Sequence, residues 1–180
     1  MELNYFNKRG QVWVETVIYT LIGLTIIGIL LAVATPKIEE MKDRLRINEV
    51  IDILGKIDLA VTDVRSAPQN ARILDLEVSK GKLVVNSTSE TIYWKLDSTY
   101  EYSQSGKDVA IGDVNVRTKQ TGSVYEIKIF KTFDLNISTK DSSGTTTDFL
   151  ELDEASIPYN LRIASVGSYG QSLEVVFSIN

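Results

Sequence analysis

The pattern of apolar and polar positions divides the chain into an apolar stretch, an amphipathic stretch and a series of short alternating segments. Residues 16–35 (TVIYTLIGLTIIGILLAVAT) contain no charged side chain. Because an α-helix rises about 1.5 Å per residue, some twenty residues span roughly 30 Å, the thickness of the hydrocarbon core of a bilayer. The first stretch therefore predicts a helix that can cross a membrane.

The amphipathic stretch over residues 37–67 continues this helix. Six of its apolar positions recur at steps of three and four residues, which places them on one helical face. Pro68 predicts the end of the helix, and Pro36 predicts a kink near residues 32–36, because proline removes a backbone donor and crowds the preceding turn. Since a helix over residues 11–67 is longer than a bilayer is thick, we expect its second half to pack on the chain's own head domain. The six positions are Ile47, Val50, Leu54, Ile57, Val61 and Val64.

Beyond Pro68 the pattern changes to short segments that alternate apolar and polar residues between clusters of Gly, Ser, Asn and Asp. Such alternation predicts six to eight strands of an antiparallel sheet or sandwich. We therefore expect an α+β protein, in which a long N-terminal α-helix precedes an antiparallel β-sandwich-like head that packs one face or edge on the helix. Residues 139–148 are expected to form a loop. The predicted strands lie at 74–78, 83–85, 92–96, 114–116, 125–129 and 173–179.

The composition excludes several classes of chemistry. The 180 residues include no Cys and no His, which rules out disulfides, thiolate nucleophiles and histidine acid–base catalysis. The net charge of −5 and the lack of a Gly-rich phosphate loop argue against a nucleic-acid partner. No serine has a recognisable base beside it. We therefore expect a protein that is not an enzyme and that needs no cofactor.

A processing signal precedes the apolar stretch. Lys8, Arg9 and Gly10 close a polar leader of ten residues, and Gln11 opens the segment that contains Glu15. In an ordinary secretory signal the apolar segment comes before the cleavage site and is discarded. Here a cut after Gly10 would instead leave the apolar helix on the mature protein.

This arrangement resembles the type IV prepilins, and more closely the archaeal class III signal peptide, whose motif runs Gln-x-Ser-x-Glu after a basic residue and Gly. The match covers residues 8 to about 35 and does not include the head; Trp13 stands where the motif usually carries Ser. The resemblance implies a structural subunit that prepilin peptidase cuts between Gly10 and Gln11. It further implies that pilus assembly machinery moves the subunit from the cell membrane into an extracellular helical homopolymer, with adhesion or surface attachment as the expected role.

Glu15 is the sharpest candidate residue in the apolar stretch. A carboxylate at membrane depth costs on the order of 2–3 kcal/mol even on lenient scales, and such residues are usually functional. The resemblance implies that Glu15 pairs with the free amine of Gln11 on a neighbouring subunit, which would offset this cost and fix the register. Cyclisation of Gln11 would remove that amine. In the alternative interpretation Glu15 snorkels to the membrane interface, one turn away.

Small residues form a second set of candidates for subunit assembly. Gly28 and Ala32 are four positions apart, a spacing that lets helices approach closely, and Gly23 lies five positions before Gly28. Small residues are common in membrane helices, so the spacing matters only if the helix packs in a filament core. Trp13 and Tyr19 either anchor the helix at a membrane interface or pack in that core, and both interpretations stay open.

The head contains two sequons and several carboxylates. Asn86-Ser87-Thr88 and Asn136-Ile137-Ser138 fit the N-glycosylation sequence, and we expect both at turns or strand ends on the outer face of the head. The carboxylates match no EF-hand spacing, so we expect a solvated acidic face and no metal site. They are Asp141, Asp148, Glu151, Asp153 and Glu154.

The main alternative to a filament subunit is an uncleaved single-pass anchor, in which Lys8 and Arg9 hold the N-terminus in the cytoplasm. Its β head would bind a partner or envelope polymer outside the cell. A minor pilin at a filament tip lies between the two, and a carboxylate-based glycosidase is a distant third. The expected domains are a leader over 1–10, a helix over 11–67 whose residues 11–35 form the membrane or filament core, and a head over 68–180.

Overall fold

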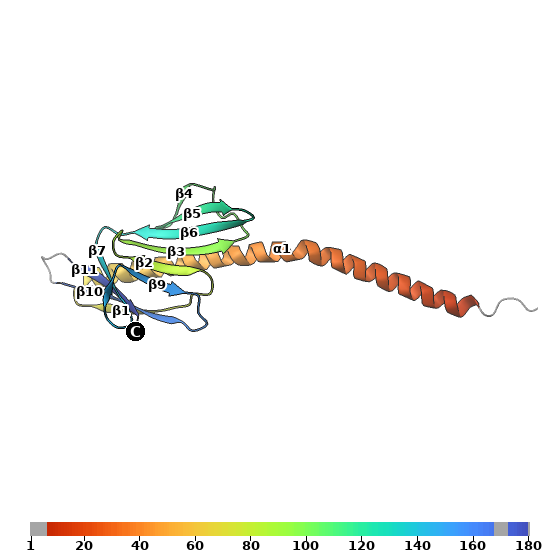
Figure 1. The fold of residues 1–180 in the computed structure, drawn as a ribbon, viewed down its shortest axis with the longest axis horizontal. Helices are drawn as coiled ribbons and strands as arrows, with labels where there is room; N and C mark the ends of the chain where they lie inside the picture. The colour runs from red at the N-terminus through yellow and green to blue at the C-terminus, as the bar shows by residue number, and fades with distance from the viewer. Residues whose placement is uncertain (1–6, 168–172, 180) are drawn as a thin grey trace, which may run out of the picture. The chain divides into compact units, whose positions relative to one another are not determined.

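Residues 7–167 and 173–179 are described by the computed structural model, in which one long helix precedes β-sheets that are mainly antiparallel (Figure 1). Helix α1 spans Asn7–Ser66. Its backbone stays helical across Pro36, and the kink expected there stays a prediction. The chain divides into two compact units, Met1–Met41 and Lys42–Asn180, so α1 contributes to both.

Helix α1 ends two residues before Pro68, where the sequence places its stop signal. Gln69 has a φ of 66°, in the left-handed region that closes many helices. The Asn70 N–H then donates to the Ala67 carbonyl at 3.1 Å and turns the chain into the first strand.

Within residues 71–167 and 173–179, eleven strands form two sheets. Sheet A has the order β1-β10-β11-β7-β8, and sheet B has the order β4-β5-β6-β3-β2-β9. Neighbouring strands in this part of the chain are antiparallel except β11 and β7, which run parallel, so the expectation of purely antiparallel pairing is wrong at that place. The strands are β1 (Ala71–Leu76), β2 (Lys82–Asn86), β3 (Thr91–Ser98), β4 (Asp108–Ile111), β5 (Val114–Thr121), β6 (Val124–Thr132), β7 (Asn136–Lys140), β8 (Thr146–Thr147), β9 (Phe149–Asp153), β10 (Tyr159–Val166) and β11 (Glu174–Ile179).

The loop predicted over residues 139–148 is largely a small hairpin. Thr139 and Lys140 close β7, and they pair with Thr147 and Thr146 of β8. The turn between these strands is held by Asp141, whose carboxylate accepts hydrogen bonds from the backbone of residues 143 and 145. The loop prediction is right for residues 141–145 and wrong for the two strands, because Ser and Thr favour turns by composition, while here their backbones complete the edge of sheet A.

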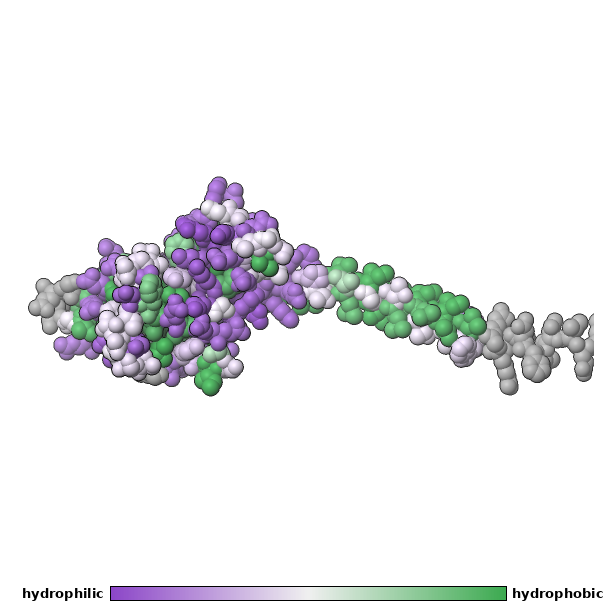
Figure 2. Space-filling view, viewed as in Figure 1, coloured by the Kyte–Doolittle hydropathy of each residue, from purple (hydrophilic) through white to green (hydrophobic). Residues whose placement is uncertain are grey.

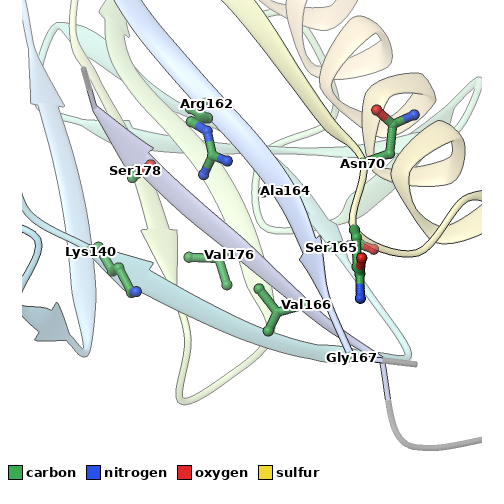
Figure 3. A pocket seen from close by; sticks show the side chains of 10 residues that line it. Asn70, Lys140, Arg162, Ala164, Ser165, Val166, Gly167, Val176 and Ser178 are labelled. Atoms are coloured by element: carbon green, nitrogen blue, oxygen red, sulfur yellow. The ribbon is translucent and has the colours of Figure 1, made fainter.

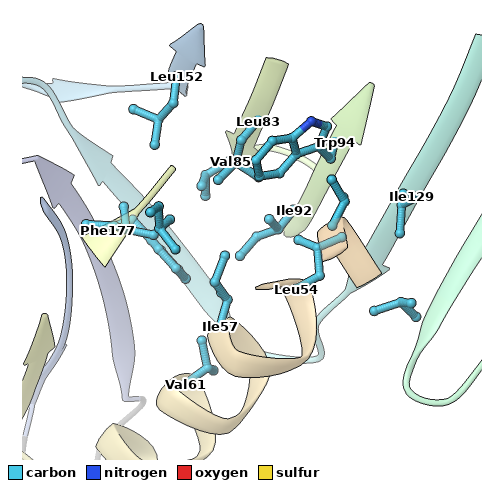
Figure 4. Close-up of a cluster of buried hydrophobic side chains, with 14 of the residues drawn as sticks. Leu54, Ile57, Val61, Leu83, Val85, Ile92, Trp94, Ile129, Leu152 and Phe177 are labelled. Carbon is cyan, nitrogen blue, oxygen red and sulfur yellow. The ribbon is translucent and has the colours of Figure 1, made fainter. Parts of the chain in front are cut away.

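One hydrophobic core within Lys42–Asn180 contains side chains from the second half of α1 and from both sheets. The six apolar helix positions predicted from their spacing are all buried, none of them more than 5% exposed. The helix thus shares its core with both sheets, and the expected β-sandwich is not confirmed. Figure 4 shows Leu54, Ile57 and Val61 of α1 directed at Leu83, Val85, Ile92 and Trp94 of sheet B and at Phe177 of sheet A.

A buried carboxylate ties the same helical segment to sheet B. Asp43 is 4% exposed, and it accepts hydrogen bonds from Lys80 Nζ at 2.8 Å and from the Thr99 backbone N–H at 2.7 Å. Burial raises the pKa of the Asp43 carboxyl, but the hydrogen bonds from Lys80 and Thr99 outweigh it, and the pKa lies below its ordinary value. Asp43 is therefore charged and paired near neutral pH.

The turn that presents Lys80 is held by two further contacts. The Trp94 indole N–H donates to the Lys80 carbonyl at 2.9 Å. Gly81 has a φ of 84°, and a Cβ at this position would lie 2.1 Å from the Lys95 carbonyl oxygen. Because any side chain would collide with backbone there, the turn requires glycine.

Candidate functional site

The apolar part of α1 is the first candidate site because it presents a continuous apolar surface. From residue 12 to residue 33 its large apolar side chains are all at least 39% exposed, and Trp13 is 73% exposed. Figure 2 shows this stretch as almost unbroken hydrophobic surface. Among the described helical residues this is a segment long and apolar enough, by length and composition, to cross a membrane. A patch of this size needs lipid or protein around it.

The hydroxyl groups in this stretch are satisfied inside the helix. Each of the four threonines donates to the carbonyl four residues earlier, at 2.8–2.9 Å. No threonine hydroxyl between residues 12 and 35 therefore needs water, and an apolar environment carries no hydrogen-bonding penalty for them. The threonines are Thr16, Thr20, Thr25 and Thr35.

Glu15 has one partner in its own helix. Tyr19, one turn later, donates its Oη hydrogen to Glu15 Oε1 at 3.1 Å. A carboxylate offers about four acceptor positions, so this bond leaves capacity for a cation from outside the helix. Sequence analysis considered Tyr19 only as an interface anchor or a packing residue and missed this role. The i, i+4 spacing of the two side chains was the available signal.

The predicted processing site lies at the margin of the described chain. Lys8, Arg9, Gly10 and Gln11 belong to the first turns of α1, and their side chains lie outside the described residues, as do residues 1–6 of the predicted ten-residue leader. Cleavage after Gly10 and the pairing of the Gln11 amine with Glu15 therefore stay predictions.

The small residues of the apolar stretch have no packing role within the described chain. A Cβ added at Gly23 or Gly28 would meet no heavy atom of the described residues within 4 Å. Glycine inside a helix costs about 1 kcal/mol relative to alanine, so these positions are not explained by the stability of α1 itself. The space beside Gly28 and the exposed Ala32 is open to a neighbouring helix.

Both sequons lie at strand ends, as expected. Asn86 is the last residue of β2 and half-buried, and its Oδ1 accepts a hydrogen bond from the Ser89 N–H at 3.0 Å. Asn136 is the first residue of β7 and is exposed. Glycosylation of either asparagine stays a prediction.

The head carboxylates do not converge on one point. Glu151 and Asp153 pair with Lys82, at 2.8 and 3.1 Å, while Asp148 and Glu154 are exposed. The hydrogen bond from the Ser143 hydroxyl and those from the local backbone lower the pKa of Asp141, which serves the β7–β8 turn. In the described residues, no three acidic side chains are grouped as metal ligands would be.

A hollow of about 350 Å³ lies on the face of sheet A that is turned away from the core (Figure 3). Arg162, Ser178 and Lys140 stand opposite one another on β10, β11 and β7 along one side of it. Ala164 and Val176 form an apolar floor, and the nearby Ser165 Oγ is buried without a hydrogen-bond partner in the described part of the chain. The hollow suits a small apolar group with a negative charge, and its described lining residues include no paired nucleophile and base. Sequence analysis did not identify it, because its residues come from strands far apart in the chain.

Comparison of the chain with protein families, with curated proteins and with solved structures finds no match.

Proposed function

We propose that the chain is a structural subunit of an archaeal type IV pilus-like surface filament, made as a precursor and cut between Gly10 and Gln11. The carrying observation is the apolar stretch of α1, which is exposed on all sides while its threonine hydroxyls are satisfied internally. Such a surface is stable in lipid before assembly and against other helices afterwards. The residue pattern around Gly10 adds the processing step.

In this proposal the apolar helices bundle at the filament centre. The Glu15 carboxylate forms an ion pair with the N-terminal amine of Gln11 from a neighbouring copy. Tyr19 holds this carboxylate in place through the hydrogen bond at 3.1 Å. Gly23, Gly28 and Ala32 allow close approach of helices. Since lipid is as apolar as the neighbouring helices, the transfer yields little hydrophobic free energy, and the charge pairing and packing decide the register.

The head forms the outer wall of the proposed filament. Its core begins at Ile47, so it does not depend on the apolar stretch for its fold. We propose that the two sheets act as a sandwich-like unit with glycans on Asn86 and Asn136, and that the wall serves surface attachment. Repeated head-to-tail contacts that do not close on themselves would produce an open helical polymer.

One observation favours the alternative of an uncleaved membrane anchor. The Tyr19–Glu15 hydrogen bond gives the carboxylate a partner inside its own helix, which lowers its need for a second chain. In that case the β head acts as a monomeric binding module outside the cell.

The N-terminal residue of the protein recovered from its native cell envelope separates the two functions. Mass spectrometry is expected to find a start at Gln11, free or cyclised. A mature population that starts at Met1 would contradict the filament proposal and favour the anchor. If the start is Gln11, Glu15→Ala should abolish assembly, whereas Glu39→Ala, an exposed carboxylate on the same helix, should not.

A further inference from the structure

A row of cations crosses the outer face of sheet B. The strand registers place Lys82 of β2 opposite Lys95 of β3, and Lys128 of β6 between Lys95 and Arg117 of β5. Because directly opposed residues lie on the same face, the four side chains stand next to one another at a strand spacing of about 4.8 Å. From β9 to β4 the row reads Asp153, Lys82, Lys95, Lys128, Arg117 and Asp108.

The two outer cations of the row bind carboxylates of the chain itself. Lys82 Nζ lies 2.8 Å from Glu151 Oε2 and 3.1 Å from Asp153 Oδ1. Arg117 makes two parallel hydrogen bonds to Asp108, from Nε and from Nη2, both at 2.5 Å. The two outer cations are therefore each paired with carboxylates of the chain itself.

The two central cations have no such partner. In the described residues no carboxylate oxygen lies within 4.0 Å of the ammonium group of Lys95 or Lys128. Both ammonium groups make cation–π contacts with the Tyr93 ring instead. Lys128 Nζ lies 4.4 Å from the Tyr93 ring centroid and 5.4 Å from that of Phe130. Like charges on opposed residues destabilise a sheet. Burial and then repulsion from Lys95 and Arg117 lower the pKa of Lys128, and attraction to Asp108 and Glu126 offsets this only in part, so a bound anion would stabilise the charged ammonium group.

The ends of the row limit the kind of anion that fits. Asp153 and Asp108 would repel an extended polyanion, such as a nucleic acid, that lay along the whole row. A compact carboxylate group placed on Lys95 and Lys128 avoids both. The opposed pair Asp97 and Glu126 lies two residues along the same strands and on the same face, so the group must also be small enough to contact the two lysines alone. Copies of this chain offer such groups in excess, since 24 Asp and Glu stand against 19 Lys and Arg.

A matching acidic patch lies on the edge of sheet A. Asp75 lies near the end of β1 and Glu77 one residue beyond it, and both are exposed while Leu76 between them is buried, so the two carboxylates lie on the same solvent-facing side. Both are exposed, and neither has an ion pair in the described parts of the chain. In those parts β1 pairs only with β10 and leaves its other edge open.

We propose that Lys95 and Lys128 form an intersubunit docking site for Asp75 and Glu77 of a second copy of this chain. The two patches lie on different sheets, so the contact is heterologous, and it builds an open polymer where the rotation from copy to copy does not close. The inference rests on the proposed function, because a filament brings many copies into such contact.

Zero-length carbodiimide crosslinking of the full chain, in filaments or in detergent-solubilised membranes, tests the contact directly. Mixed isotope-labelled and unlabelled copies should yield amide-linked peptides that join Lys95 or Lys128 of one copy to Asp75 or Glu77 of another. Crosslinks that map only to other pairs would overturn the proposal. The N-terminal residue is determined in the same sample. A start at Met1 together with this crosslink would contradict the proposed filament function and support the proposed contact between copies.

Charge exchange supplies a second, independent test. Two double variants reverse the charge of one patch each: Lys95→Glu with Lys128→Glu, and Asp75→Lys with Glu77→Lys. Each should lower the assembled fraction about ten-fold, and the variant that combines all four substitutions should restore it. Lys107→Glu, an exposed lysine outside the row, is the matched control and should have no effect. Unchanged thermal unfolding of each variant shows that the fold is intact. The proposal is contradicted if the variant with all four substitutions does not regain the assembled fraction. It is also contradicted if Lys95 and Lys128 bind an acidic polymer in place of a second copy.

Discussion

The two parts of α1 both carry many apolar residues, yet they use them in opposite ways. In the first part, Leu24 is 61% exposed and Val33 is 67% exposed. In the second part, Ile57 is 1% exposed and Val64 is 0% exposed. The first part is apolar on every side, so no single head domain can cover it, whereas a stripe at steps of three and four needs only one packing surface. The arrangement of apolar residues, more than their number, thus indicates whether the partner is the same chain or another.

The largest expected effect comes from breaking the buried stripe while leaving the exposed stretch intact. Ile57→Ala should destabilise the head by about 2–5 kcal/mol, because it opens a cavity between the helix and both sheets. Leu24→Ala is the matched control and should leave the head's unfolding unchanged. Chemical denaturation of the full chain in detergent, followed by Trp94 fluorescence in a Trp13→Phe background, measures both. Equal effects would show that the two parts of α1 do not differ as described.

The next effect concerns the charged contact that accompanies the stripe. Asp43→Asn should destabilise the head by about 2–3 kcal/mol, since Lys80 and Thr99 lose an ionised acceptor. Asp63→Asn is the control, because Asp63 lies on the same helix and its pair with Arg72 is exposed, which predicts a change of about 0.5 kcal/mol or less.

The same carboxylate predicts a dependence on pH. The pKa of Asp43 is lower in the folded chain than its ordinary value of 3.8, so its contribution is present above pH 3.8 and is lost as the pH falls through the folded pKa. Denaturation curves between about pH 6 and pH 2.5 should show this loss in the parent chain and not in Asp43→Asn. Parallel pH profiles for the two proteins would contradict the assignment.

A smaller effect comes from Gly81, in the turn that holds Lys80. Comparison with Gly106 separates the steric requirement for glycine from the requirement for a positive φ. Gly81→Ala should cost about 2 kcal/mol or more, because its Cβ meets the Lys95 carbonyl in addition to the left-handed backbone. Gly106 has a similar φ of 80° with open space around it, so Gly106→Ala should cost only about 1 kcal/mol. Equal costs, measured by thermal unfolding, would remove the steric explanation.

The smallest expected effect concerns the hydrogen bond between Tyr19 and Glu15 in the exposed part of α1. Tyr19→Phe removes the hydrogen bond to Glu15 and keeps the ring, so under the proposed function the filament yield should fall only a few-fold, in line with about 1 kcal/mol for one hydrogen bond. Sedimentation of sheared filaments, with Glu15→Ala beside it, gives the comparison. If Tyr19→Phe were as severe as Glu15→Ala, the tyrosine would have to act in subunit docking itself.

Much of the secondary structure followed from local patterns. The helix predicted over residues 11–67 and strands such as β3 and β6 came from periodicity and from the position of Pro68, since periodicity reports one face of one element. The observed helix, Asn7–Ser66, begins four residues earlier, within the predicted leader. The expected six to eight strands are too few, since the described residues form eleven. The short strands β4 and β8 carry too few alternating residues to be recognised, β7 is hidden in a run of Ser and Thr, and β9 and β10 were missed although they alternate. In the apolar stretch, Glu15 and the small residues stood out by composition, while the Tyr19 bond needed a rotamer that sequence does not report.

By itself the sequence determined which residues of α1 face a partner, because helical spacing is a property of neighbouring residues. It also determined that residues 16–35 need an apolar environment, because they contain no charge. Only the tertiary structure decided that Lys82, Lys95, Lys128 and Arg117 form one row, that β7 runs parallel to β11, and that Gly81 lies against a carbonyl. Strand register and close approach depend on pairing between residues far apart in the chain, and no local pattern contains that information.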